Sequence, residues 1–127
     1  MANILQDRVL DNGLSIIDTE ADRIDIVSQD PTTYTEATST YSLGNKDFGA
    51  SGTAFGAPAA ATPNGRKVTS NAITDGSVTA TGTATGWAVV EVANTRLLAN
   101  GDLSASQALT SGNTFTLPAF DIRIPNQ

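Results

Sequence analysis

The sequence contains neither cysteine nor histidine among its 127 residues. Disulfides and thiolate metal sites are therefore excluded, as are imidazole ligands and the Ser-His and Cys-His pairs of nucleophilic enzymes. What remains is the chemistry of carboxylates, lysine, tyrosine and hydroxyl groups. Paired carboxylates can hydrolyse glycosides, but aromatic residues that would stack a sugar make up only 6% of the chain. We expect no enzymatic activity, no cofactor and no metal, and we keep a carboxylate-based hydrolase as the remote alternative.

Basic residues are also few. Seven Lys and Arg stand against thirteen Asp and Glu, which gives a net charge of −6. Nucleic-acid binding depends on clustered Lys and Arg that neutralise phosphates, and anionic membrane surfaces attract the same residues. The one adjacent basic pair is Arg66-Lys67, which fits a solvated loop. We therefore expect neither a nucleic acid nor a membrane as a partner.

Long apolar runs are absent too. No run reaches the roughly 18 residues that a membrane span needs, and the acidic, polar start of the chain lacks the features of a signal peptide. We expect a protein made and folded in a cytoplasm. The length fits a single domain over residues 1–127. Because Ala, Thr, Ser and Gly dominate, the core must come from Val, Ile, Leu and Ala, and contacts in a homo-oligomer are a natural further source of stability.

Short segments rich in β-branched residues alternate with turn signals about every eight to twelve residues, which predicts an all-β fold built as an antiparallel β-sandwich. A jelly roll is one form that such a sandwich can take. The central stretch is 86–103, with a strand over 87–93, a turn at 93–95, a returning strand over 96–99 and a second turn at Asn100-Gly101-Asp102. Trp87 is the only tryptophan, and we interpret it as a core residue in preference to a surface on which a ligand stacks.

Alternation and turn residues also predict the other strands. They are expected at 23–28, 67–73, 77–82, 105–110, 114–117 and 120–124, with turns at Asp75-Gly76 and Ser111-Gly112-Asn113. The predicted interior residues are Ile24, Ile26, Val68, Val78, Trp87, Val89, Val90, Val92, Leu97, Leu98, Leu103, Leu109, Phe115, Leu117, Phe120, Ile122 and Ile124.

Residues 1–20 predict an N-terminal helix or arm. Apolar residues at helical spacing favour a short helix over 2–12, and Asn12-Gly13 is a typical stop signal. The spacing of Asp18, Glu20 and Asp22 superficially matches a calcium loop, but Arg23 stands where such a loop needs glycine, so we interpret a solvated acidic turn.

Residues 44–66 form an extended Gly/Ala/Pro loop, and a structureless stretch of this length is usually functional or mobile. Phe48 and Phe55 are its only large apolar residues, and they fasten it either to its own domain or to a neighbouring subunit. Tyr34 and Tyr41, in the polar connection before this loop, are open to the same two interpretations, as loop anchors or as interface contacts. We take Phe48, Phe55, Tyr34 and Tyr41 as the candidate interface residues.

Several phrases of the sequence, taken in order, resemble a group of small structural proteins encoded by tailed bacteriophages. The resemblance extends from about residue 10 to residue 125 and rests on SQDPTTY (28–34), ATSTYSLG (37–44), GRKV (65–68), TGTATGWA (81–88), SGNTF (111–115) and FDI (120–122).

This resemblance implies a non-enzymatic β-sandwich that assembles on a phage particle. Within that class, capsid decoration (cement) is the first expectation: a homo-oligomer, commonly a trimer, bridges subunits of the major capsid protein on the capsid surface. The protein would be made in the cytoplasm of the bacterial host. The alternative is a structural or adhesion domain of the tail or neck. The N-terminal segment and the 44–66 loop are the candidate arms for reaching a neighbour.

Overall fold

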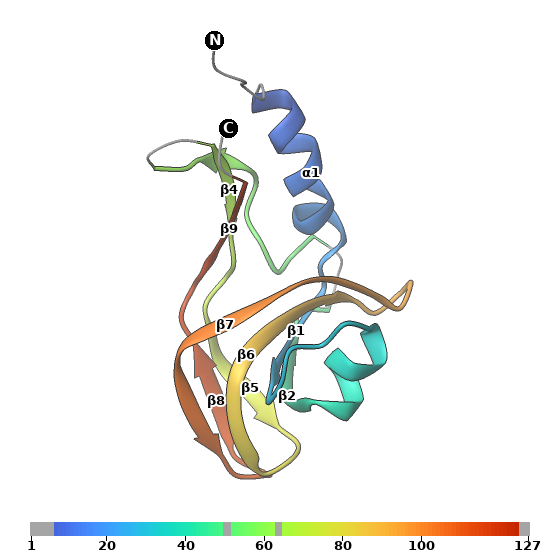
Figure 1. Cartoon of the computed structure of the whole chain (residues 1–127), viewed down its shortest axis with the longest axis vertical. Helices are drawn as coiled ribbons and strands as arrows, with labels where there is room; N and C mark the ends of the chain where they lie inside the picture. The colour runs from blue at the N-terminus through green and yellow to red at the C-terminus, as the bar shows by residue number, and fades with distance from the viewer. Residues whose placement is uncertain (1–6, 50–51, 63–64, 125–127) are drawn as a thin grey trace.

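The structure is a computed structural model of the chain and describes residues 7–49, 52–62 and 65–124 (Figure 1). Its elements in chain order are α1 (Asp7–Glu20), β1 (Arg23–Val27), the π-helical turn η1 (Glu36–Thr40), β2 (Ser42–Asp47), β3 (Ala59–Ala60), β4 (Arg66–Thr69), β5 (Ile73–Val78), β6 (Gly82–Glu91), β7 (Arg96–Leu109), β8 (Thr114–Leu117) and β9 (Asp121–Ile124). No described helix is long and apolar enough to cross a membrane.

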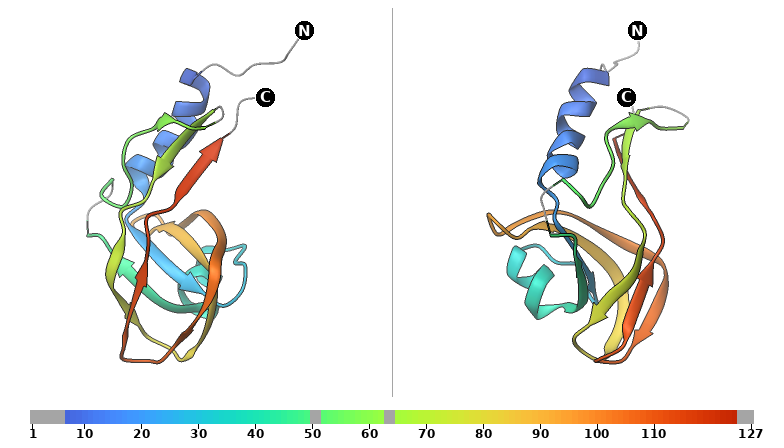
Figure 2. Two further views of the ribbon diagram at one scale, coloured as in Figure 1. Left: turned by 90° about the vertical axis from the view of Figure 1, so that its left-hand side faces the viewer. Right: turned by 180° about the vertical axis from the view of Figure 1, so that it is seen from behind.

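The strands form two antiparallel sheets. The six-stranded sheet has the order β7-β6-β1-β2-β5-β8, and the three-stranded sheet has the order β3-β4-β9. The large sheet curls into a half-barrel, and the small sheet extends from one end of it beside α1 (Figure 2). The predicted mainly β, antiparallel, sandwich-like fold is confirmed. The strands divide six and three, whereas a jelly roll is built from eight.

The central strand β1 is buried on both faces. Ile24 and Ile26 belong to the main core cluster, and Val27 belongs to a second cluster that includes Ala37 of η1. The segment carrying η1 thus covers the outer face of the sheet, as Figure 1 shows beside β1 and β2. Because successive side chains on a strand point to opposite faces, Asp25 belongs to the same covered face as Val27, and it is 0% exposed.

Most predicted interior residues are buried or half-buried. The prediction was wrong for Val92, which is exposed. The buried members of the prediction are Ile24, Ile26, Val68, Val78, Val89, Val90, Leu109, Phe115 and Leu117. Val92 is 36% exposed, because β6 ends one residue earlier and Val92 begins the turn. Its carbonyl accepts a hydrogen bond from Thr95 N, which closes the hairpin, and Thr95 takes a positive φ of 52°.

Two predicted turns lie inside strands, and both predictions were wrong for the same reason. Gly76 is part of β5, and Asn100-Gly101-Asp102 is part of β7. A Cβ at Gly76 would overlap the ring of Phe115 on the neighbouring strand, and a Cβ at Gly101 would overlap the indole of its cross-strand partner Trp87. Each glycine therefore leaves space for an aromatic side chain and does not form a turn.

The strand predicted over 77–82 was also wrong. β5 ends at Val78, and the chain turns before β6 begins at Gly82. The carbonyl of Leu43 accepts hydrogen bonds from Thr79 N and Ala80 N and holds this turn against the start of β2. The segments predicted at 96–99 and 105–110 are the two ends of the single strand β7.

The helix does not stop at Asn12-Gly13 but continues to Glu20. Leu14 and Ile17 pack on the main core, so burial of this face outweighs the helix-breaking tendency of glycine. Gly13 also allows close approach to β9, since a Cβ there would lie 3.4 Å from Ile124 Cδ1. The predicted start at Ala2 lies outside the described residues.

The predicted 44–66 loop is shorter than expected and is fastened to its own domain. Its beginning belongs to β2, its end includes β3, and Phe55 forms a bridge with Ser70 beside β4. Phe48 N and Gly52 N donate to the carbonyls of Asp22 and Ala21, so the loop is held against the link between α1 and β1.

We expect the Gly101→Ala substitution to destabilise the protein by about 1–3 kcal/mol, since the added methyl group would displace a packed indole. Urea unfolding monitored by Trp87 fluorescence measures this loss. Gly56→Ala is the matched control, because the nearest atom to its new Cβ would be Thr69 O at 3.9 Å. Equal stability of both variants would show that Trp87 does not depend on the space above Gly101.

Candidate functional site

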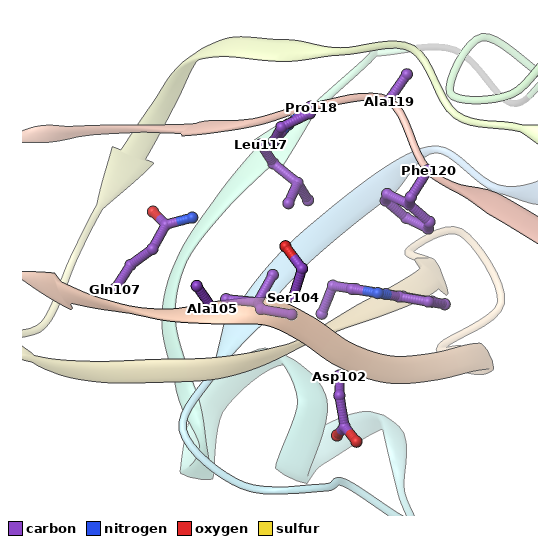
Figure 3. A pocket seen from close by; sticks show the side chains of 10 residues that line it. Asp102, Ser104, Ala105, Gln107, Leu117, Pro118, Ala119 and Phe120 are labelled. Carbon is purple, nitrogen blue, oxygen red and sulfur yellow. The ribbon is translucent and has the colours of Figure 1, made fainter.

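A cavity of about 320 Å³ opens where the half-barrel fails to close. β7 and β8 are the two end strands of the curled sheet, and they follow each other in the chain through the turn 110–113. The cavity lies between β7 and the segment from β8 to β9, and we call it the seam site (Figure 3). Its lining residues are Trp87, Asp102, Leu103, Ser104, Ala105, Gln107, Leu117, Pro118, Ala119 and Phe120.

A large bulge in β7 shapes one side of the seam site. Ala84 pairs with Gln107 and Gly86 pairs with Asp102, so residues 103–106 of β7 lie opposite the single residue Thr85 of β6. Such extra residues bend a strand and redirect its side chains. Figure 3 shows Ser104, Ala105 and Gln107 pointing from β7 toward the other side of the cavity, with Leu117 pointing back at them.

The other side departs from β7 because the chain leaves the large sheet after Leu117. Pro118 follows directly and cannot donate a main-chain hydrogen bond. Two hydrogen bonds then join Phe120 to Ser70. Phe120 N donates to Ser70 Oγ at 3.0 Å, and Ser70 N donates to Phe120 O at 2.8 Å. These bonds direct the chain into the small sheet and away from β7.

Aromatic residues form the deep wall of the seam site. The rings of Trp87 and Phe120 stack with centroids 4.2 Å apart at 28°, and Phe120 meets Phe55 edge-on at 5.8 Å. Because Gly101 lies against the benzo part of the indole, Trp87 packs between Gly101 and Phe120. Trp87 is half-buried, packs against the main core and also lines the cavity.

The polar groups of the seam site are few and mostly neutral. Ser104 and Gln107 face the cavity, whereas Asp102 points to the opposite side of β7 from Leu117 and lies at the rim (Figure 3). Gln107 Nε2 donates to Thr116 O at 3.4 Å, a long hydrogen bond near the closed end of the seam. The site therefore combines an apolar interior with one carboxylate at its edge.

Buried carboxylates lie elsewhere and are neutralised by arginines. Asp25 receives Arg23 Nε at 2.7 Å, Arg23 Nη2 at 2.9 Å and Ser42 Oγ at 2.6 Å. Burial raises the pKa of Asp25 above its usual value of 3.8, and the hydrogen bonds from Arg23 and Ser42 oppose this only in part. This arrangement is a brace between β1 and β2 under the η1 segment.

A second acidic group lies where α1 ends and the β6–β7 hairpin turns. Arg96 Nη1 is 3.5 Å from Glu20 Oε1 and 3.9 Å from Glu91 Oε1, and Glu91 is 6% exposed. Asp22 Oδ1 accepts a hydrogen bond from Val92 N at 3.0 Å. Together these contacts hold the hairpin to the end of the helix. Among the described residues, no group of three or more acidic, His or Cys side chains is placed to hold a metal ion.

The four candidate interface residues do not gather at one place. Tyr34 and Tyr41 are half-buried over the second cluster, outside the curled sheet, while Phe48 is half-buried against the main core. Phe55 is 3% exposed, which favours the interpretation that it fastens the loop to its own domain. None of the four lines the seam site.

Sequence reasoning found the apolar lining of the seam site but not the site itself. Trp87, Leu103, Leu117 and Phe120 were all expected in the interior. The available signal was Pro118-Ala119 between two short strands, because a proline at this point favours an interruption of the strand ladder.

No protein-family model, curated protein or solved structure matches this chain. Interpretation of the seam site therefore depends on its own geometry.

We expect Arg96→Ala to lower the free energy of unfolding by about 0.5–1 kcal/mol, because the buried Glu91 and the partly exposed Glu20 lose a cation whose own side chain is 59% exposed. Urea denaturation measures the change. In a Glu91→Gln background the same substitution should cost less, since one of the two charges is gone. An equal cost in both backgrounds would exclude coupling between Arg96 and Glu91.

Asp25 predicts a defined pH dependence. Because its pKa is raised in the folded state, its contribution to stability is fully present below the usual value of 3.8 and is lost as pH rises through the folded-state pKa. The stability of the wild type minus that of Asp25→Asn should therefore decrease from about pH 3 to about pH 7. Denaturation of both proteins across this range tests it, and an increasing difference would mean that the Arg23 pairing outweighs burial.

Proposed function

We propose that this protein is a structural component of a tailed-bacteriophage particle and that it decorates the capsid surface. The sequence phrases between residues 28 and 122 support the placement in a phage particle. The mainly antiparallel, sandwich-like fold agrees with what that resemblance implies.

The lining of the seam site is the observation that supports a binding role over a catalytic one. Hydrolysis by two carboxylates needs both groups to flank the substrate. The seam site has a single carboxylate, Asp102, and it points away from the interior. Asp25 and Glu91 are buried beside arginines and do not line the cavity. An apolar cavity with two neutral polar groups is suited to hold a partner and not to break a bond.

The proposed mechanism is passive reinforcement. Folded copies bridge neighbouring subunits of the major capsid protein and raise the barrier to their separation. Many copies on one shell multiply weak contacts through avidity, so a modest interface on each copy is sufficient. We propose a homo-oligomer with a trimer as the favoured form, and Tyr34, Tyr41 and Phe48 remain candidate contacts because each is half-buried. Placement in the tail or neck is the second candidate.

Electron microscopy of particles from a phage that encodes this chain, labelled with an antibody against it, tests the proposal. We expect regular label over the head, and particles lacking the protein should release their genome at lower temperature. Label confined to the tail or neck would favour the second candidate. Absence of the protein from purified particles by mass spectrometry would contradict both placements.

A further inference from the structure

We propose that the seam site accepts an extended segment of a partner protein, which adds a strand to the half-barrel at the edge of β7. The inference builds on the proposed binding role but not on the position in a phage particle. The two can therefore fail separately.

Main-chain pairing is the first argument. β7 and β8 are the end strands of the curled sheet, so each has a sheet neighbour on one side only. The free edge of such a strand carries N–H and C=O groups that another strand can pair with. Near the closed end, the Gln107 side-chain amide reaches Thr116 O, so a side chain makes a contact that a neighbouring strand's N–H would make in a closed barrel.

The edge of β7 is the better template of the two. It is a strand of 14 residues, whereas β8 has four and is followed by Pro118, which has no N–H. Residues 103–106 of β7 also have no register partner on β6, so this part of the strand bulges where it borders the cavity. Added strands bind mainly through main-chain groups.

The cavity and the rim charge define the side chains of the occupant. A volume of about 320 Å³ has room for a few side chains but not for a folded element. Alternate side chains of an added strand would point inward to Leu103 and Leu117 and outward beside Asp102. Because Asp102 is exposed and the whole chain carries a charge of −6, a segment with inward apolar and outward basic residues is complementary.

A capped synthetic peptide, Thr-Val-Lys-Val-Lys-Val-Thr, is the probe. We expect saturable changes in Trp87 fluorescence, with amide chemical-shift changes confined to residues 102–107 and 114–117. A peptide with Glu in place of both Lys should bind more weakly. If the Lys peptide produces no saturable change in these residues at millimolar concentration, the proposal is overturned.

Two variants test the rim charge. Asp102→Lys should weaken binding of the Lys peptide about two- to fivefold, in the range of an exposed ion pair. Asp30→Lys is the matched control, because it makes the same charge change at an exposed loop position outside the cavity lining, and it should bind as the wild type does. Equal weakening by both variants would indicate nonspecific attraction and contradict the site.

Main-chain methylation tests the strand itself. Alternate N–H groups of an extended peptide point to opposite edges of the strand. We therefore use two versions of the Lys peptide, one N-methylated at odd-numbered residues and one at even-numbered residues. The two versions differ only in which strand edge lacks donors. One version should lose binding and the other should retain it. If both bind as the parent does, no strand is added. If the protein alone self-associates in sedimentation and the amide shifts of residues 102–107 change with protein concentration, the occupant is a second copy, and the partner assignment is overturned.

Discussion

The packing of Trp87 between Gly101 and Phe120 is the contact on which the rest of the structure depends. It joins β6 to β7 on one side and to the β8–β9 link on the other. Phe120 also contacts Phe55, and it hydrogen-bonds with Ser70 just before the chain enters β9 of the small sheet. One aromatic chain therefore connects the curled sheet, the small sheet and the long loop. It also explains the seam, because the chain that reaches Phe120 has already left the edge of β7.

The outer face of the sheet depends on a different constraint, the burial of a charge in the central strand. Removing one partner from a buried ion pair leaves an uncompensated charge and is strongly destabilising. Arg23 supplies the opposite charge to Asp25, and the hydrogen bond from Ser42 joins β1 to the start of β2. The segment 28–41 packs on the same face of the sheet, where Tyr34 and Tyr41 lie against the second cluster. Aromatic residues that look like surface contacts in the sequence are thus partly used in covering the sheet.

The sequence was sufficient to predict strands and turns where the local pattern agrees with burial. It was insufficient where a glycine leaves space for a side chain from another element. Alternation located Ile24 and Ile26 correctly, and Ser111-Gly112-Asn113 is a turn with Gly112 at a φ of 90°. Gly13 was predicted to end the helix, and Gly76 and Gly101 to form turns, yet each lies beside a side chain from another element. Such a contact follows from strand register and helix packing, which a local pattern does not contain. The seam site has the same origin, since its edges meet only once the strand order is set.

The composition and the seam site lead to one view of how this protein recognises others. A chain without histidine or cysteine and with few aromatic residues has little side-chain chemistry for a surface site. Its largest aromatic contacts are used inside the domain, between Trp87, Phe120 and Phe55. Main-chain groups on a free strand edge are independent of composition, and they bind an extended segment with little help from side chains. In the proposed many-copy assembly, such a contact would combine modest affinity with a defined register, and the half-barrel leaves the edge of β7 without a sheet neighbour.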